Sequence, residues 1–115
     1  MNEPVIVLSN AGSGPEAQHI ARTLVEERLA ACVNVVPRMH SIYRWQGEIE
    51  EAEEWMMWIK TTQKRAGQAI ARLVELHSYE LPAALIIPIT GGHDAYLKWI
   101  TSSTQEDDTE AHFPA

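Results

Sequence analysis

The sequence predicts an α+β domain in which one antiparallel sheet carries helices on one face. Short β-branched runs alternate with amphipathic helical stretches, and two strand patterns in the middle follow each other with no helix between them. The length of 115 residues fits one domain, and 45% hydrophobic with 22% charged residues is ordinary globular composition.

The first elements are a strand and a helix. Residues Val5–Leu8 form a continuous apolar run, which is typical of a central strand buried on both faces. A turn follows, and Ser13 or Gly14 is expected to cap a helix that begins at Pro15. Apolar residues then recur at helical spacing, so the helix is expected to end near residues 29–30.

The middle of the chain predicts a long hairpin. A strand starts at Cys32, and Pro37 indicates a bulge or an edge because proline donates no ladder hydrogen bond. Gln46 and Gly47 have the composition of a hairpin tip. The glutamates of residues 48–62 favour a helix by propensity, but the tip and the Trp-Met-Met-Trp-Ile run favour a second long strand.

The last third predicts a helix, a short strand and a final helix. Apolar residues recur at helical spacing over 66–77, and Pro82 prevents the helix from continuing. Residues 84–87 form a short apolar strand, and Asp94 is expected to cap the last helix. From Ser102 onward the chain is polar.

The resulting order is β-α-β-β-α-β plus a C-terminal helix, which is the ferredoxin-like arrangement. Two central strands of about 15 residues would reach about 50 Å, longer than a small domain is wide. Because this hairpin carries Trp45, Trp55 and Trp58, we expect it to pack against another subunit. We predict one domain over residues 1–103 and an acidic, disordered tail over 104–115.

The net charge of −7 is concentrated in two short segments. Four acids lie in the tail and five more lie within residues 48–54, so the rest of the chain is slightly basic. This balance argues against a nucleic acid or an anionic membrane as partner. The N-terminus shows no secretory signal, and no apolar run approaches the ~20 residues of a membrane span, so we expect a cytoplasmic protein.

Cys32 and His77 are the candidate metal ligands, because a thiolate and an imidazole suit copper or zinc. The local spacing makes no site by itself, since no C-x-x-C or H-x-x-x-H pattern occurs. From spacing alone, Cys32 is better explained as a small buried hydrophobe, and His77 as a residue near a helix C-terminus. Alternation along a strand would divide the glutamates of 48–54 between two faces, which favours a solvated arm over a cation cage. No local catalytic signature is present.

Four segments of the chain resemble the CutA divalent-cation tolerance proteins. They are Glu27-Arg28-Leu29-Ala30-Ala31-Cys32-Val33-Asn34, Ser41-Ile42-Tyr43-Arg44-Trp45-Gln46-Gly47-Glu48-Ile49, Ile59-Lys60-Thr61-Thr62 and Tyr96-Leu97-x-Trp99-Ile100. The resemblance extends from about Val5 to Ser102. It implies a ferredoxin-like protomer in a tight homotrimer, similar to PII signalling proteins, with the hairpins packed between subunits. It also implies tolerance to divalent metals and copper binding, and we expect no enzymatic activity because the family is not an established enzyme family.

The resemblance also implies site residues. Cys32 matches the cysteine that follows the Ala-Ala pair, and His77 matches the histidine of the family's H-P-Y-x-x-P-E segment. Both are the suggested copper ligands of the family. The chain departs from the pattern at Ser78, Ala83 and Ser9, where the family has a proline, a glutamate and, in some members, a cysteine. With that carboxylate and that thiol missing, we expect weak binding and no required cofactor.

We therefore expect a metal-responsive, non-catalytic homotrimer that binds Cu(II) or another divalent ion weakly, with itself and the ion as partners. An alternative is a PII-like signalling or scaffold trimer that holds a small anionic effector or a protein partner in clefts between subunits. Lys60, Arg65 and Tyr79 are the candidate cleft residues in that case. A trimer whose sites are vestigial is a third possibility.

Overall fold

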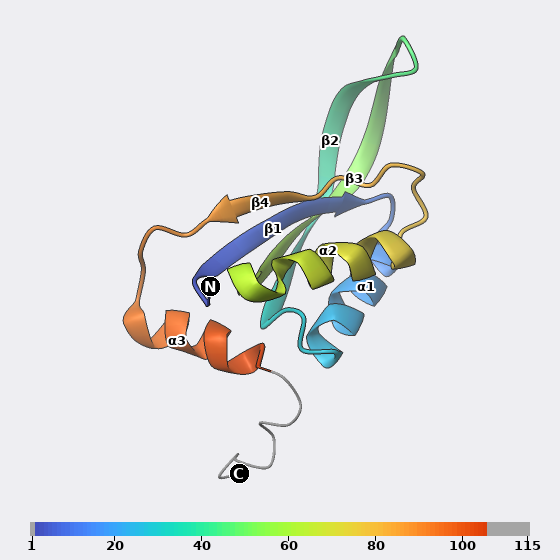
Figure 1. Cartoon of the computed structure of the whole chain (residues 1–115). Coiled ribbons are helices and arrows are strands. Elements are labelled where there is room, and N and C mark those ends of the chain that lie inside the picture. Colours follow the sequence, from blue (N-terminus) through green and yellow to red (C-terminus); the bar gives the residue numbers. More distant parts are fainter. Residues whose placement is uncertain (1, 106–115) are drawn as a thin grey trace.

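The computed structural model describes residues 2–105 and contains one four-stranded sheet with α1 and α2 on one face (Figure 1). The elements are β1 (Pro4–Ala11), α1 (Gly14–Glu26), β2 (Cys32–Trp45), β3 (Glu48–Thr62), α2 (Gln63–Leu76), β4 (Leu85–Pro88) and α3 (Asp94–Ser103). The strand order is β2-β3-β1-β4 and every neighbouring pair is antiparallel. The predicted α+β class and ferredoxin-like order are confirmed.

The core lies between the sheet and the helices α1 and α2. In β1 the residues Val5, Val7 and Ala11 are at most 2% exposed, whereas the alternate residues are only partly buried. The prediction that this strand is buried on both faces was therefore wrong. Helices cover only one face of the sheet, so β1 alternates like a half-covered antiparallel strand.

The face of the sheet opposite α1 and α2 is apolar, and we call it the open sheet face. Ladder partners share a face, so the register of β1 with β3 and β4 and of β2 with β3 assigns its members. Its apolar members are Ile6, Leu8, Val36, Met56, Trp58, Leu85 and Ile87, and Asn10, Cys32, Asn34 and Lys60 lie on the same face. Trp58 is 37% exposed, Val36 40% and Leu85 61%.

Helix α1 begins at Gly14, one residue before the predicted start at Pro15, and ends earlier than predicted. The Ser13 hydroxyl accepts a hydrogen bond from the backbone N–H of Glu16 at 3.2 Å, which confirms the cap. The helix ends at Glu26, not near residues 29–30, because Arg28 takes a left-handed φ of 61°. Leu29 and Ala30 lie beyond the helix but point into the core, where they are 8% and 1% exposed. Because they are apolar and buried, they extend the helical spacing of the sequence although they are not helical.

The cap of the last helix was also predicted wrongly. His93 is the N-cap of α3, and Asp94 is the first helical residue. No side-chain hydrogen bond caps this end. The Asp94 carboxylate still lies in the first turn, where a negative charge is favourable to the helix dipole.

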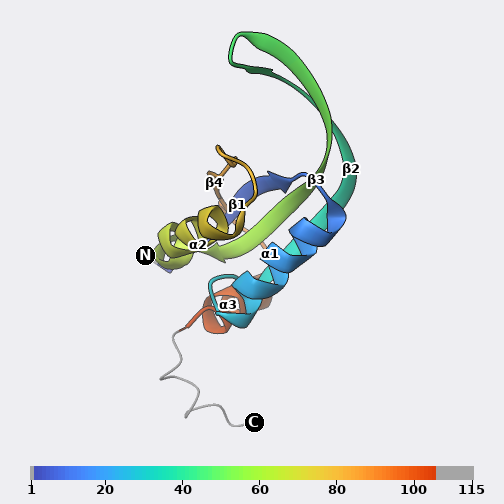
Figure 2. The ribbon, with the colours of Figure 1, turned by 90° about the vertical axis from the view of Figure 1, so that its right-hand side faces the viewer.

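The predicted hairpin is confirmed, with 14 residues in β2 and 15 in β3. Gln46 and Gly47 both have positive φ, 52° and 84°, as a tight two-residue turn requires. The register shifts between Val36 and Met39, which confirms the bulge expected at Pro37. The hairpin extends the molecule to 53 × 26 × 22 Å and arches toward the loop between α2 and β4 (Figure 2).

The chain end is described only as far as residue 105. Thr104, which the prediction placed in the tail, is 3% exposed, and its carbonyl accepts a hydrogen bond from Nε of Arg65 at 2.8 Å. The acidic residues from Glu106 onward lie outside the described residues. Within residues 2–105, no helix is long and apolar enough to cross a membrane.

Leu24→Ala is expected to lower the free energy of unfolding by about 2–5 kcal/mol, because this fully buried side chain of α1 would leave a cavity. Val25 is the adjacent residue and is 40% exposed, so Val25→Ala is expected to change that free energy by less than about 0.5 kcal/mol. Urea unfolding followed by circular dichroism measures both. Equal losses in the two variants would contradict the described core.

Candidate functional site

Cys32 lies at the start of β2 on the open sheet face. Its ladder partner is Lys60, and the next pair on the same face is Asn34 with Trp58. The thiol is partly exposed and donates to Oδ1 of Asn34 at 3.6 Å. Cys32 therefore offers a sulfur ligand at the surface of the protomer.

His77 lies at the C-terminal cap of α2, and its side chain is 0% exposed. Its Nδ1 accepts a hydrogen bond from the backbone N–H of Tyr79 at 3.1 Å. Its Nε2 lies 2.6 Å from the carbonyl oxygen of Asn10 and must be the protonated nitrogen, since a carbonyl only accepts. Both ring nitrogens are thus occupied by backbone groups of the same chain.

The structure does not bring Cys32 and His77 together within one chain. Cys32 is level with Ile6, two strands away, whereas His77 contacts Asn10, four residues further along β1. Strand geometry separates these positions by about 10 Å across the sheet and about 13 Å along it. Among residues 2–105 no group of three or more His, Cys, Asp or Glu side chains could hold a metal ion.

The loop of residues 77–84, between α2 and β4, is held by hydrogen bonds to the edge of the fold. The Glu16 carboxylate accepts from the backbone N–H of Ser78 at 2.7 Å. At the other end of the loop, the buried Ser9 hydroxyl donates to the carbonyl of Ala83 at 2.6 Å. Together with the two bonds of the His77 ring, these contacts fix the loop beside the end of β1.

Glu16 is the titratable group that this anchoring perturbs. Partial burial raises the pKa of its carboxyl, but the hydrogen bonds from Ser78, the nearby His77 and the backbone of Gly12 lower it by more. The net effect is a lowered pKa. The carboxylate form of Glu16 is therefore the form that holds the 77–84 loop.

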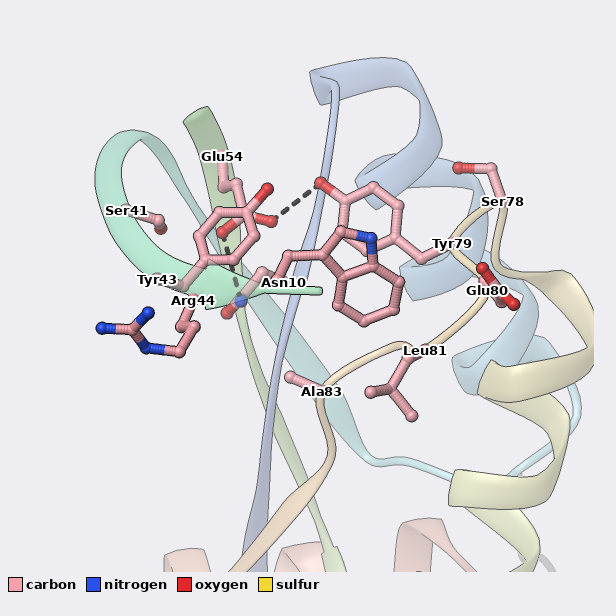
Figure 3. A pocket seen from close by; sticks show the side chains of 11 residues that line it. Asn10, Ser41, Tyr43, Arg44, Glu54, Ser78, Tyr79, Glu80, Leu81 and Ala83 are labelled. Atoms are coloured by element: carbon pink, nitrogen blue, oxygen red, sulfur yellow. Dashed lines mark hydrogen bonds between the residues drawn. The ribbon is translucent and has the colours of Figure 1, made fainter. Parts of the chain in front are cut away.

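A cleft of about 620 Å³ lies between the arched hairpin and the 77–84 loop (Figure 3). At its base, Glu54 is 6% exposed and accepts from the Tyr79 hydroxyl at 2.7 Å and from Nδ2 of Asn10 at 3.4 Å. Burial and the hydrogen bond to Glu54 raise the pKa of Tyr79, so its phenol remains a donor. The walls include Ser41, Tyr43, Trp45 and Leu81.

Gly12 and Gly14, at the start of α1, make room for this arrangement. A side chain on Gly12 would meet the Tyr79 hydroxyl at 3.0 Å, and one on Gly14 would meet Nε1 of Trp55 at 3.3 Å. Tyr79 therefore lies so close to position 12 that a Cβ there would displace its hydroxyl by a few tenths of an ångström.

The three candidate cleft residues do not lie together. Lys60 donates to the hydroxyl of Tyr96 on α3 at 3.1 Å and lies 5.3 Å from the centre of its ring. Arg65 is 8% exposed and bonds Thr104. Lys60 therefore joins α3 to β3, Arg65 joins the C-terminal cap of α3 to α2, and of the three only Tyr79 lines the cleft.

Glu54 and Asn10 are residues of the cleft that the sequence analysis did not single out. The available signal was the alternation along β3, which placed Glu54 on the opposite face from Glu51 and Glu53. The register confirms that division, because Glu54 pairs with Met39 and Glu53 with His40. No sequence pattern predicted that the β2–β3 hairpin arches over Glu54.

Fold and site together define a ferredoxin-like protein with a long β-hairpin, a surface thiol on an open sheet face and a cleft beneath the hairpin. The family model described as CutA1 divalent ion tolerance protein matches residues 5–103. The chain therefore belongs to the CutA1 divalent ion tolerance family.

Individual relatives agree with this assignment. The divalent-cation tolerance protein CutA of Thermus thermophilus is 44% identical over 86% of this chain and 96% of its own length. The corresponding protein of Pectobacterium atrosepticum is 36% identical over 88% and 92%. The chain spans about half the length of the mouse and human CutA proteins that it matches.

Solved structures of the family share the fold. The crystal structure of CutA from Xylella fastidiosa has a TM-score of 0.88 at 41% identity, covering 90% of this chain and 99% of that one. The divalent cation tolerance protein of Thermus thermophilus has a TM-score of 0.86 at 43% identity, covering 89% and 99%.

Glu16→Gln is expected to reduce the loss of stability in acid. Because the pKa of Glu16 is lowered by folding, its contribution is complete above the unfolded pKa of about 4.3 and is lost as the pH falls through the folded pKa. A glutamine can still accept from Ser78 but does not titrate. Urea unfolding between about pH 3 and pH 7 measures the slope.

The matched control for that experiment is Glu26→Gln, which removes an exposed carboxylate from the same helix. The control is expected to retain the wild-type dependence of unfolding free energy on pH. If Glu16→Gln retained it as well, Glu16 would not be the group that anchors the loop.

Proposed function

We propose that this protein is a non-catalytic, homotrimeric divalent-cation tolerance protein that binds Cu(II) or a similar ion weakly through Cys32. One observation carries the proposal: the open sheet face is apolar, and Cys32 lies on it. Membership of the CutA1 family supports the role in tolerance to divalent cations.

The composition of the open sheet face supports the proposed assembly. A sheet face that meets water normally carries polar residues, but here Trp58, Val36 and Leu85 are between 37% and 61% exposed. A contiguous apolar surface of this kind marks an interface between proteins. The expectation that three chains meet there rests on the resemblance to the CutA family.

The metal site is proposed at Cys32 because it is the one cysteine of the sequence and its thiol is free and partly exposed. Thiolate suits copper and other borderline ions. Residues 2–105 supply no cluster that completes the coordination within one chain, so further donors are expected from a neighbouring chain across the open sheet face. Coordination by a single thiolate of each chain agrees with weak binding.

His77 is proposed as the second ligand, after Cys32. To coordinate an ion, its ring must release the carbonyl of Asn10 or the N–H of Tyr79. Leaving such a buried backbone group without a partner costs about 1–3 kcal/mol. The binding energy of any ion at His77 is reduced by that amount.

An anionic effector is disfavoured in the cleft beneath the hairpin by the charges that line it. Two carboxylates, Glu54 and Glu80, line it against the one guanidinium of Arg44. Arg44 moreover donates to the carbonyl of Gly47 in the hairpin turn. We therefore propose no anionic effector for this cleft, and an effector or protein partner in clefts between subunits stays a prediction.

Trp58→Lys is expected to dissociate the assembly, because it places a charge in the middle of the open sheet face. Val25→Lys adds the same charge to the exposed side of α1 and is expected to leave the assembly unchanged. Sedimentation velocity measures the mass against the 12.9 kDa protomer. A wild-type protein that sedimented as a monomer would refute the homotrimer.

Cys32→Ser is expected to weaken the binding of Cu(II) by at least about tenfold, since it removes the sulfur ligand. Calorimetric titration measures it, and a second titration with Zn²⁺, which has no redox chemistry, excludes thiol oxidation as the source of heat. His77→Gln should weaken binding less than Cys32→Ser. His19→Gln, at an exposed position on α1, is the control for non-specific imidazole binding.

Isotherms of wild type and Cys32→Ser that superimposed would remove Cys32 from the metal site. The same result for His77→Gln would remove His77 and leave the proposal for Cys32 intact.

A further inference from the structure

Glu54 is a buried carboxylate without a cationic partner. It is 6% exposed, and its partners in residues 2–105 are the neutral donors Asn10 and Tyr79. By contrast, its neighbour Glu53 on the other face pairs with Arg38 at 3.4 Å while remaining half exposed. Buried charges in proteins are normally paired, so Glu54 is unusual on this strand.

The two existing hydrogen bonds orient Glu54 without saturating it. An ionised carboxylate offers about four acceptor positions. Tyr79 occupies one at Oε2 and Asn10 occupies one at Oε1, at the longer distance of 3.4 Å. At least one position on each oxygen therefore remains for a donor that enters from the cleft.

Aromatic rings surround the approach to this carboxylate. Tyr43 and Trp45 of the hairpin and Tyr79 of the 77–84 loop all line the cleft, and Figure 3 shows Tyr43 and Tyr79 among the side chains that line it with Glu54. The faces of such rings attract cations. The apolar side chain of Leu81 adds a surface for a hydrocarbon body.

We infer that this cleft binds a small organic cation, a primary ammonium group on an aromatic or aliphatic body, with Glu54 as its counter-ion. The ammonium group donates to the free positions of the carboxylate and lies against the rings, while the body lies along the apolar wall. The volume of about 620 Å³ lies within the range of small-molecule sites, about 300–1,000 Å³.

The same features disfavour other occupants. A hard metal ion requires several oxygen ligands, and no qualifying group of carboxylates exists in residues 2–105. A lysine or arginine side chain from a second copy would satisfy the charge, but one such side chain is much smaller than the cleft. That occupant is an outcome that the experiment distinguishes.

The test is calorimetric titration of the full-length protein with phenethylammonium at about pH 7, where the amine is protonated. The neutral analogue 2-phenylethanol is titrated in parallel, and a chelator is present throughout so that the result is independent of the proposed metal site. Phenethylammonium is expected to bind at least about tenfold more tightly than the alcohol, as a charge-assisted hydrogen bond predicts.

Glu54→Gln is the decisive variant, because it keeps an acceptor for Tyr79 and removes the charge. It is expected to weaken phenethylammonium binding by at least about tenfold. Glu53→Gln makes the same change on the opposite face of β3 and should leave the affinity within about twofold of wild type.

A second variant, Tyr43→Ala, tests the proposal independently in case Glu54→Gln fails to fold. Tyr43 is 44% exposed, so Tyr43→Ala removes one ring from the cleft without opening the core, and it should weaken binding several-fold. Equal affinity for the amine and the alcohol, or wild-type affinity in both variants, would overturn the proposal. Absence of binding at millimolar amine would overturn it too, and would point to a side chain of a second copy as the occupant.

Discussion

The alternation of side chains along β3 is the constraint on which the rest of the structure depends. This 15-residue strand pairs with β1 on one side and with β2 on the other, so every second residue is assigned to one face of the sheet. Met57, Ile59 and Thr61 are fully buried against the helices. Glu54, Trp58 and Lys60 lie on the other face, and a slip of one residue would exchange the two sets. The core, the open sheet face and the base of the cleft are therefore set by one register.

The 77–84 loop depends on that register, because its anchors are residues that the sheet holds in place. Ser9 and Asn10 come from the end of β1, and Glu54 comes from β3. Ser9 stands where some family members have cysteine, and its hydroxyl makes a short hydrogen bond to Ala83 that a weakly polar thiol would make less well. The departures from the family pattern at Ser9, Ser78 and Ala83 thus lie at the points where this loop is attached. In this chain the hydrogen bonds of His77 and its loop stabilise the fold, and they must be broken before His77 can bind a metal ion.

Element types and order could be predicted from the sequence because each rests on local pattern, as the hairpin tip at Gly47 and the bulge at Pro37 illustrate. The helix end was misplaced because buried residues beyond it, Leu29 and Ala30, continue the apolar spacing in a non-helical conformation. The candidate site was less predictable. The distance between Cys32 and His77 follows from pairing across three strands, and no local spacing encodes it. Likewise, the arch of the hairpin over Glu54 depends on tertiary structure.

The glutamates of the hairpin illustrate how one charge run acquires different roles. Glu51 and Glu53 face water and pair with His40 and Arg38, which makes them a solvated surface of small energetic value. Glu54 has the same chemistry but faces the cleft and is buried. Along β3 it stands six residues from Lys60, the ladder partner of Cys32, a separation of about 20 Å. Sites that far apart with no shared partner behave additively, so a soft metal ion at Cys32 and an organic cation at Glu54 are expected to bind independently within a chain.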